Sequence, residues 1–164
     1  LQAEIGKDFD YYKVRTLRIQ LMNQHINTYG LDEKPGLGEL LDYLKEHKYL
    51  TAVATATDPE RTKQYLGSLD RLKYFDQIVC ASMVQNGKPA PDIYLEAAAR
   101  LHVHPSECMA LEDSPNGILS AYRAGMYPVM IPDLSEPDED TKKLLYGCTD
   151  HLSKVIKLLE NCKL

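Results

Sequence analysis

The sequence predicts an α/β fold in which a parallel sheet carries helices on both faces. After residue 36, short apolar runs alternate with amphipathic segments, the order in which strands and helices follow one another in parallel sheets. The apolar runs are nearly continuous, as in strands that are buried on both faces. Two helices are expected to open with a capping residue and a proline, at Asp58-Pro59 and at Ser114-Pro115.

The first long segment, residues 8–29, is predicted to be a helix with apolar side chains on two sides. Such a helix is usually packed between partners. Asp8–Asp10 is interpreted as the helix start, because no apolar strand precedes these acids and Tyr11-Tyr12 stands where a tight turn needs glycine. Gly30 is expected to end the helix, and Lys34–Gly36 breaks the chain again.

The rest of the chain alternates between the two kinds of element. Leucines at helical spacing predict a helix that begins at residue 37. Ligands of parallel sheets bind beyond the carboxyl ends of the strands, so residues at those ends are the candidates for a site. The predicted strands are 50–54, 77–81, 108–111 and 129–131, and the later predicted helices begin at 59 or span 91–101, 114–125, 141–146 and 152–159.

Bulk properties exclude several classes of protein. A length of 164 residues suits a domain with a proper core. The net charge of −5 argues against a nucleic-acid partner, and the longest apolar runs are far too short to span a membrane. The four cysteines have no CxxC spacing. We interpret them as free thiols in a reducing compartment and expect a cytoplasmic protein.

Thr55 and Lys88 are the first candidates for a site. Thr55 follows the predicted strand 50–54 and can donate its hydroxyl to a phosphoryl oxygen, although threonine is also a common strand residue. Lys88 lies in Gly-Lys-Pro-Ala-Pro-Asp, where two prolines stiffen the loop. An ammonium group held in a fixed direction can neutralise an anionic nucleophile and a phosphate together. The alternative for Lys88 is an ordinary solvated lysine.

Glu112 and Asp113 are adjacent carboxylates at the end of the predicted strand 108–111. They would repel each other near a buried edge, and a divalent cation removes that cost. The alternative is that one of them is solvated while Ser114 caps the following helix.

Taken together, these motifs resemble the haloacid dehalogenase (HAD) superfamily. Thr55, the Lys88 motif and Glu112-Asp113-Ser-Pro-Asn-Gly are similar to its second, third and fourth motifs. Tyr74-Phe75-Asp76 and Ile93-Tyr94 are similar to the β-phosphoglucomutase and phosphatase-like branch. The resemblance covers nearly the whole chain.

The resemblance implies a Rossmann-like core with a helical cap and a magnesium-dependent aspartyl-phosphate mechanism. Residues 1–33 would be the C-terminal part of the cap with its linker, and residues 34–164 the core without its first strand. By analogy, Thr55, Lys88 and the backbone near Ala56 bind the phosphoryl group, Lys88 also steadies the aspartate, and Glu112 and Asp113 hold Mg²⁺. The substrate would be a small phosphorylated metabolite, and its identity does not follow from the sequence.

The chain departs from the family at its first motif, Asp-x-Asp-Gly, which supplies the nucleophile and the general acid/base and is absent here. We therefore expect a fragment that is inactive alone and that needs an N-terminal segment of the same protein. The alternative is a non-catalytic module that binds phosphate and metal or serves as a scaffold. Without the family's central strand, strands 50–54 and 108–111 are expected to lie roughly 9–10 Å apart, twice the usual spacing.

Overall fold

A computed structural model describes residues 10–133 and 136–162 of the chain. The chain divides into two compact units, Leu1–Asp32 and Glu33–Leu164. This division falls one residue before the predicted boundary between residues 33 and 34. The interpretation of the first unit as part of a cap remains a prediction.

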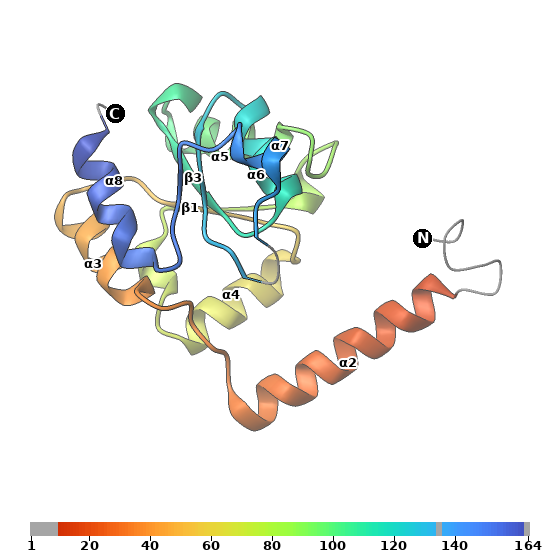
Figure 1. Ribbon diagram of the computed structural model, residues 1–164. Coiled ribbons are helices and arrows are strands. Elements are labelled where there is room, and N and C mark those ends of the chain that lie inside the picture. The colour runs from red at the N-terminus through yellow and green to blue at the C-terminus, as the bar shows by residue number, and fades with distance from the viewer. Residues whose placement is uncertain (1–9, 134–135, 163–164) are drawn as a thin grey trace. The chain divides into compact units, whose positions relative to one another are not determined.

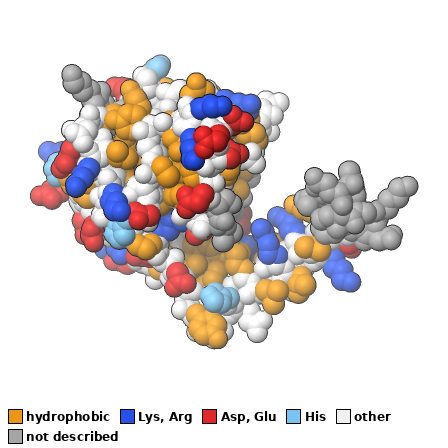
Figure 2. Space-filling model, in the orientation of Figure 1, with side chains coloured by type: hydrophobic (Ala, Val, Ile, Leu, Met, Phe, Trp, Pro, Cys, Tyr) orange, Lys and Arg blue, Asp and Glu red, His pale blue; other side chains and the backbone are white. Residues whose placement is uncertain are grey.

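The first unit contains the helix α2 (Tyr11–Tyr29). The Asp10 carboxylate accepts a hydrogen bond from the Lys13 N–H at 2.9 Å, and Gly30 ends the helix with a φ of 85°. Asp8 of the predicted helix start lies outside the described residues. No side chain of α2 is buried, and hydrophobic side chains are exposed along it (Figure 2). The packing of this helix between partners, which its two apolar sides suggest, stays a prediction.

The second unit contains two parallel sheets (Figure 1). In one sheet, β1 (Ala52–Thr55) pairs with β2 (Gln77–Cys80). In the other, β4 (Tyr127–Met130) lies between β3 (Met109–Glu112) and the two-residue β5 (Gly147–Cys148). The α/β class predicted from the sequence is thus confirmed. The sheet is divided, however, because β1 and β3 do not pair with each other.

Helices lie on both faces of the sheets in this unit. The two helix caps predicted from the sequence are present. The Asp58 carboxylate accepts a hydrogen bond from the Arg61 N–H at 3.0 Å, and the Ser114 hydroxyl accepts one from the Gly117 N–H at 3.1 Å. The helices are α3 (Leu37–Glu46), α4 (Pro59–Ser68), α5 (Asp92–Leu101), α6 (Pro115–Arg123), α7 (Glu139–Lys142) and α8 (Val155–Asn161), with short 3₁₀ helices η1 (Leu72–Tyr74), η2 (Ala81–Met83), η3 (Pro105–Glu107) and η4 (Leu152–Lys154).

Two sequence predictions were wrong near the C-terminus. The helix predicted over 141–146 ends as α7 at Lys142, and β5 follows it, although no pattern indicated a strand there. The strand predicted from residue 129 begins at Tyr127. Pro128 is the second residue of β4, and its carbonyl oxygen accepts from the Tyr146 N–H at 2.8 Å, just before β5 begins. The missing N–H of Pro128 would point to this same side, where the short β5 has not yet started, so the proline is tolerated.

The buried side chains form two clusters. One gathers around Val79, Ile93 and Ala98 and involves β2, α5 and α6. The other gathers around Leu40 and Val129 and involves α3, β4 and α8. Ala52 and Ala54 of β1 pack against the first cluster, and Met109 and Leu111 of β3 pack against the second.

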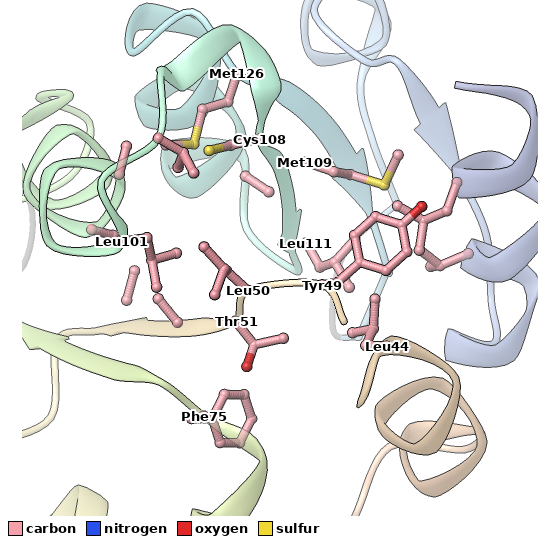
Figure 3. A pocket seen from close by; sticks show the side chains of 18 of the residues that line it. Leu44, Tyr49, Leu50, Thr51, Phe75, Leu101, Cys108, Met109, Leu111 and Met126 are labelled. Carbon is pink, nitrogen blue, oxygen red and sulfur yellow. The ribbon is translucent and has the colours of Figure 1, made fainter. Parts of the chain in front are cut away.

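A cavity of about 550 Å³ occupies the gap between the two sheets (Figure 3). Its lining includes Ala52 and Ala54 of β1 and Met109 and Leu111 of β3. The sequence predicted that these two strands would not form a direct ladder, and the sheet order confirms this.

Candidate active site

The loop that carries Lys88 is stabilised by hydrogen bonds between its own residues. The main-chain N–H and the side-chain amide of Asn86 both donate to the Asp92 carboxylate, at 3.0 and 2.9 Å. The Ala90 N–H donates to the Gly87 carbonyl oxygen at 3.0 Å, and the Lys88–Pro89 peptide bond is cis. The loop therefore leads into α5 with a defined path.

Helix α6 fixes the same loop from a second direction. The Ser120 hydroxyl is fully buried and donates to the Ala90 carbonyl oxygen at 2.6 Å. The Arg123 guanidinium donates to the Pro89 carbonyl oxygen at 3.0 Å. These bonds hold the two residues that follow Lys88, and so they restrict where its side chain can reach.

Lys88 links the ends of the two strands that do not pair. Its ammonium group donates to the Ala54 carbonyl oxygen of β1 at 3.1 Å and forms an ion pair with the Glu112 carboxylate of β3. The side chains of Lys88 and Glu112 are only 20% and 8% exposed. A cation is thus held at the carboxyl ends of both strands, at the mouth of the gap.

The Glu112 carboxylate receives two further hydrogen bonds. The Tyr94 hydroxyl donates to it, and the Ser114 hydroxyl donates to its Oε2 at 3.3 Å. Burial, and then the charge of Glu112, raise the pKa of Tyr94, so this hydroxyl stays protonated and remains a donor. Lys88 also lies over the Tyr94 ring, 4.9 Å from its centroid.

Gly117 permits this arrangement because it has no side chain. A Cβ at this position would overlap the Glu112 carboxylate. The glycine belongs to the sequence motif that drew attention to Glu112, yet its role depends on this close contact and cannot be read from the motif alone. Tyr94 was likewise part of a quoted motif, and its hydroxyl contact with Glu112 was not predicted. The sequence signal, a tyrosine in the helix that follows the lysine loop, is weak.

Thr55 is the last residue of β1, and Ala56 follows it exposed to solvent. The Thr55 hydroxyl oxygen accepts a hydrogen bond from the Thr57 N–H at 3.1 Å, which leaves its proton available as a donor. Helix α4 begins four residues after Thr55. The Thr55 hydroxyl and the N-terminus of α4 are both groups of a kind that can bind phosphoryl oxygens.

Asp113 follows Glu112 and is exposed. The two carboxylates suit magnesium, which commonly binds one or two carboxylates together with water and phosphate oxygens. Within residues 10–133 and 136–162, no three side chains of His, Cys, Asp or Glu form a cluster that could hold a metal.

The described part of the chain brings four predicted residues to one edge. Thr55 ends β1, Glu112 ends β3, Asp113 is next in sequence, and Lys88 bridges the two strand ends. The functional role of each residue remains a prediction. Every helix in the described ranges is too short or too polar to serve as a membrane span.

Comparison with known proteins identifies the family. The model of the haloacid dehalogenase-like hydrolases matches residues 3–131, most of the chain. The chain belongs to this family. It resembles the β-phosphoglucomutase and phosphatase branch in sequence and has the α/β fold of the solved members.

Three relatives illustrate the similarity. A phosphorylated carbohydrates phosphatase from Thermotoga maritima is 41% identical over 96 residues, 58% of this chain and 44% of that protein. The β-phosphoglucomutase of Bacillus subtilis is 38% identical over 98 residues, 60% and 42% of the two chains. The crystal structure of CbbY from Rhodobacter sphaeroides in complex with phosphate has a TM-score of 0.68 and 30% identity, covering 74% of this chain and 55% of that one. The match thus spans less than half of either of these two curated relatives.

Proposed function

We propose that this chain provides most of the active site of a phosphatase or phosphomutase that acts on a small phosphorylated metabolite. The observation that carries the proposal is the position of Lys88, whose ammonium group joins the carboxyl ends of β1 and β3. A fixed cation at that place stabilises the charge that develops on a phosphoryl group during transfer. The names of the relatives, a carbohydrate phosphatase and a phosphoglucomutase, support the same class.

Each residue of the site has a proposed role. Thr55 donates its hydroxyl to a phosphoryl oxygen, and the backbone N–H groups near Ala56 bind the other oxygens. Lys88 binds both the phosphoryl group and the attacking carboxylate, which lowers their mutual repulsion. Glu112 and Asp113 hold Mg²⁺, which when bound supplies charge neutralisation for the phosphoryl oxygens.

The nucleophile of this proposal is an aspartate carboxylate from outside the described residues. Its oxygen forms a bond to phosphorus as the ester P–O bond breaks, and the departing alkoxide takes a proton from the second aspartic acid of the same Asp-x-Asp-Gly motif to become the alcohol. In a phosphatase, water then attacks the phosphorus of the aspartyl-phosphate and releases inorganic phosphate. In a mutase, a second hydroxyl group of the sugar accepts the phosphoryl group instead. The 164-residue chain by itself is expected to be inactive.

We also propose that the reaction takes place in the cytoplasm. The four cysteines are free, which suits a reducing compartment. The substrate is expected to be selected by residues of the cap. We propose residues 1–33 as only the C-terminal part of that cap.

The test compares the 164-residue chain with a version that its own gene extends upstream through a strand ending in Asp-x-Asp-Gly. We expect the extended protein to release phosphate from p-nitrophenyl phosphate or from sugar phosphates only with Mg²⁺, and the shorter chain to release none. Asp113→Asn should lower kcat by orders of magnitude, because a magnesium ligand is lost. Unchanged turnover in Asp113→Asn would remove Asp113 from the mechanism.

One observation favours the alternative of a non-catalytic phosphate- and metal-binding module. In the described ranges, the carboxylate in contact with Lys88 is Glu112, which is already hydrogen-bonded to Tyr94 and Ser114. If the gene encodes no aspartate motif upstream, and the chain still binds phosphate with Mg²⁺ in calorimetry, this alternative replaces the enzyme.

A further inference from the structure

We propose that Ser120 and Arg123 of α6 are positioning residues for Lys88, and that α6 sets the position of this lysine relative to Glu112. Their hydrogen bonds reach the loop that carries Lys88 rather than the lysine side chain itself. The contacts that support the positioning role are present whatever reaction the site performs. The expected effect on turnover rests on the proposed function.

The lysine loop, residues 87–91, depends on donors from outside itself. Pro89 and Pro91 have no main-chain N–H, so neither residue can donate a main-chain hydrogen bond. Pro89 and Ala90, the two residues that follow Lys88, are partly buried, and carbonyl oxygens shielded from water need donors. Side chains of α6 supply donors to both of these oxygens. The path of the chain next to Lys88 is therefore set by α6 as well as by the loop.

Ser120 provides the buried contact. The residue is 0% exposed, and its hydroxyl donates to the Ala90 carbonyl oxygen at 2.6 Å. A serine inside a helix commonly bonds to a carbonyl of its own preceding turn, and a buried hydroxyl without a partner is costly. Here the hydroxyl bonds instead to a residue 30 positions away, in another segment. A buried serine at this place is thus accounted for by the loop that it holds.

Arg123 provides a second contact, three residues further along α6. Residues at this spacing lie on the same side of a helix, so Arg123 and Ser120 can reach the same segment. The Arg123 guanidinium donates to the Pro89 carbonyl oxygen at 3.0 Å. Two consecutive carbonyl oxygens of the lysine loop are therefore held by two side chains one turn apart. Two attachment points restrict the loop more than one of them would.

The other end of α6 contacts the partner of Lys88. The Ser114 hydroxyl, which caps α6, donates to the Glu112 carboxylate at 3.3 Å. The absence of a side chain at Gly117 leaves room for the same carboxylate. Between the two ends, Ile118 is fully buried and anchors the helix in the core. One helix thus supports both members of the ion pair between Lys88 and Glu112, and a change at either end of α6 alters their relative position.

The first test observes the Lys88 ammonium group in the 164-residue chain alone, by ¹H–¹⁵N NMR of lysine side chains. The group is mostly buried and bonded to the Ala54 carbonyl oxygen and to Glu112, so we expect slow proton exchange and a visible signal. Lys88→Arg assigns this signal. Ser120→Ala and Arg123→Met should shift it or broaden it beyond detection, because the loop moves. An undetectable signal in the wild-type chain would contradict a fixed Lys88.

The controls for this measurement are Ser68→Ala and Arg100→Met. Ser68 is a helical serine whose hydroxyl donates to the Tyr65 carbonyl oxygen of its own helix. Arg100 is a helical arginine that forms an ion pair with Glu96. Neither substitution should move the Lys88 signal. If the two α6 variants give the wild-type signal, or if all four variants shift it alike, α6 does not position Lys88 and the proposal is wrong.

The second test measures turnover of sugar phosphates with Mg²⁺ in the protein extended upstream. A group misplaced by about 1 Å can cost about a hundredfold in rate, even when the substitution lies far from the chemistry. We expect Ser120→Ala and Arg123→Met to lower kcat about tenfold to a hundredfold with little change in KM, since Lys88 stabilises charge that develops during transfer. Arg123→Lys keeps a donor and should retain most of kcat. Equal losses in Arg123→Lys and Arg123→Met would contradict a role through the hydrogen bond.

The two measurements separate this inference from the proposed function. If the extended protein releases no phosphate while the Lys88 signal responds to Ser120→Ala and Arg123→Met, the proposed function fails and the positioning role stands. If Lys88→Met and Asp113→Asn abolish turnover while Ser120→Ala and Arg123→Met leave it intact, the positioning role fails and the proposed function stands.

Discussion

At the scale of single residues, the site depends on how Glu112 is compensated. Its side chain is 8% exposed, and its carboxylate is held by Lys88, Tyr94 and Ser114. Removing the cation would leave a mostly buried charge without its partner, which costs more than the loss of an exposed ion pair. The residues that stabilise the fold here are therefore the same residues to which the proposed chemistry is assigned.

Lys88→Met is expected to lower the free energy of unfolding by about 1–3 kcal/mol, because Glu112 is left unpaired in a poorly solvated place. Adding Glu112→Gln should recover part of this loss. Urea unfolding measures both. The control is Lys142→Met, at an ion pair whose side chains are 55% and 84% exposed, where the expected change is below about 0.5 kcal/mol. Equal losses in Lys88→Met and Lys142→Met would show that Glu112 is not buried as described.

Gly117→Ala is expected to displace the Glu112 carboxylate, because the added Cβ overlaps it. We expect lower stability and weaker binding of Mg²⁺ with phosphate. Gly67→Ala is the matched control: nothing lies within 4 Å of the added methyl group, and alanine is favoured over glycine in a helix by about 1 kcal/mol. Thermal unfolding of the two variants should therefore shift in opposite directions. A Gly117→Ala protein that is as stable as Gly67→Ala would contradict the close contact.

At the scale of elements, Glu33 at the start of the second unit is held by Arg71, three residues after the end of α4. The guanidinium donates two hydrogen bonds to the Glu33 carboxylate, at 2.7 and 3.0 Å. This bidentate contact has better geometry than a typical surface ion pair. The hydrogen bonds from Arg71 hold the pKa of Glu33 below its ordinary value of 4.5.

The contact between Glu33 and Arg71 predicts a loss of stability in acid. A carboxyl group with a lowered folded pKa contributes stability that is present above the unfolded value and lost as the pH falls through the folded one. We expect Glu33→Gln to lower stability at pH 7 and to shrink the loss between pH 7 and values below 4.5. Asp150→Asn is the control, because Asp150 also has a lowered pKa but forms its ion pair with Lys154 at an exposed position. The measurement is the urea unfolding midpoint as a function of pH across this range. Parallel curves of midpoint against pH for wild type and Glu33→Gln would contradict the prediction.

The sequence predicted elements well where a local signal exists. The caps at Asp58 and Ser114 act through residues only three positions away, so the pattern alone was enough. β5 was missed because two residues, Gly147 and Cys148, carry no periodicity and become a strand only by pairing with β4. The contact between Tyr94 and Glu112 was missed for a related reason, since it joins residues 18 positions apart.

At the scale of the whole molecule, the alternation of strands and helices was enough to predict the α/β class and that Thr55, Lys88 and Glu112 lie at one edge of the strands. The gap was also predictable, because no apolar run in the sequence stood for the strand that separates β1 from β3 in the family. Its lining was not predictable, since it depends on how α3, α5 and α8 pack around it.

The division of the apolar side chains into two clusters has a consequence for cooperativity. One cluster contains Val79 of β2 and extends to Ala110 of β3, the other contains Val129 of β4, and β1 and β3 do not pair across the gap. Domains that unfold in one step owe this to continuous packing, whereas weakly connected parts open as separate units. We expect the amides of Val79 and Val129 to report different opening free energies in native-state hydrogen exchange of the chain alone. A strand bound between the sheets would make these values converge, so the two halves would melt as one body only when the centre of the sheet is filled.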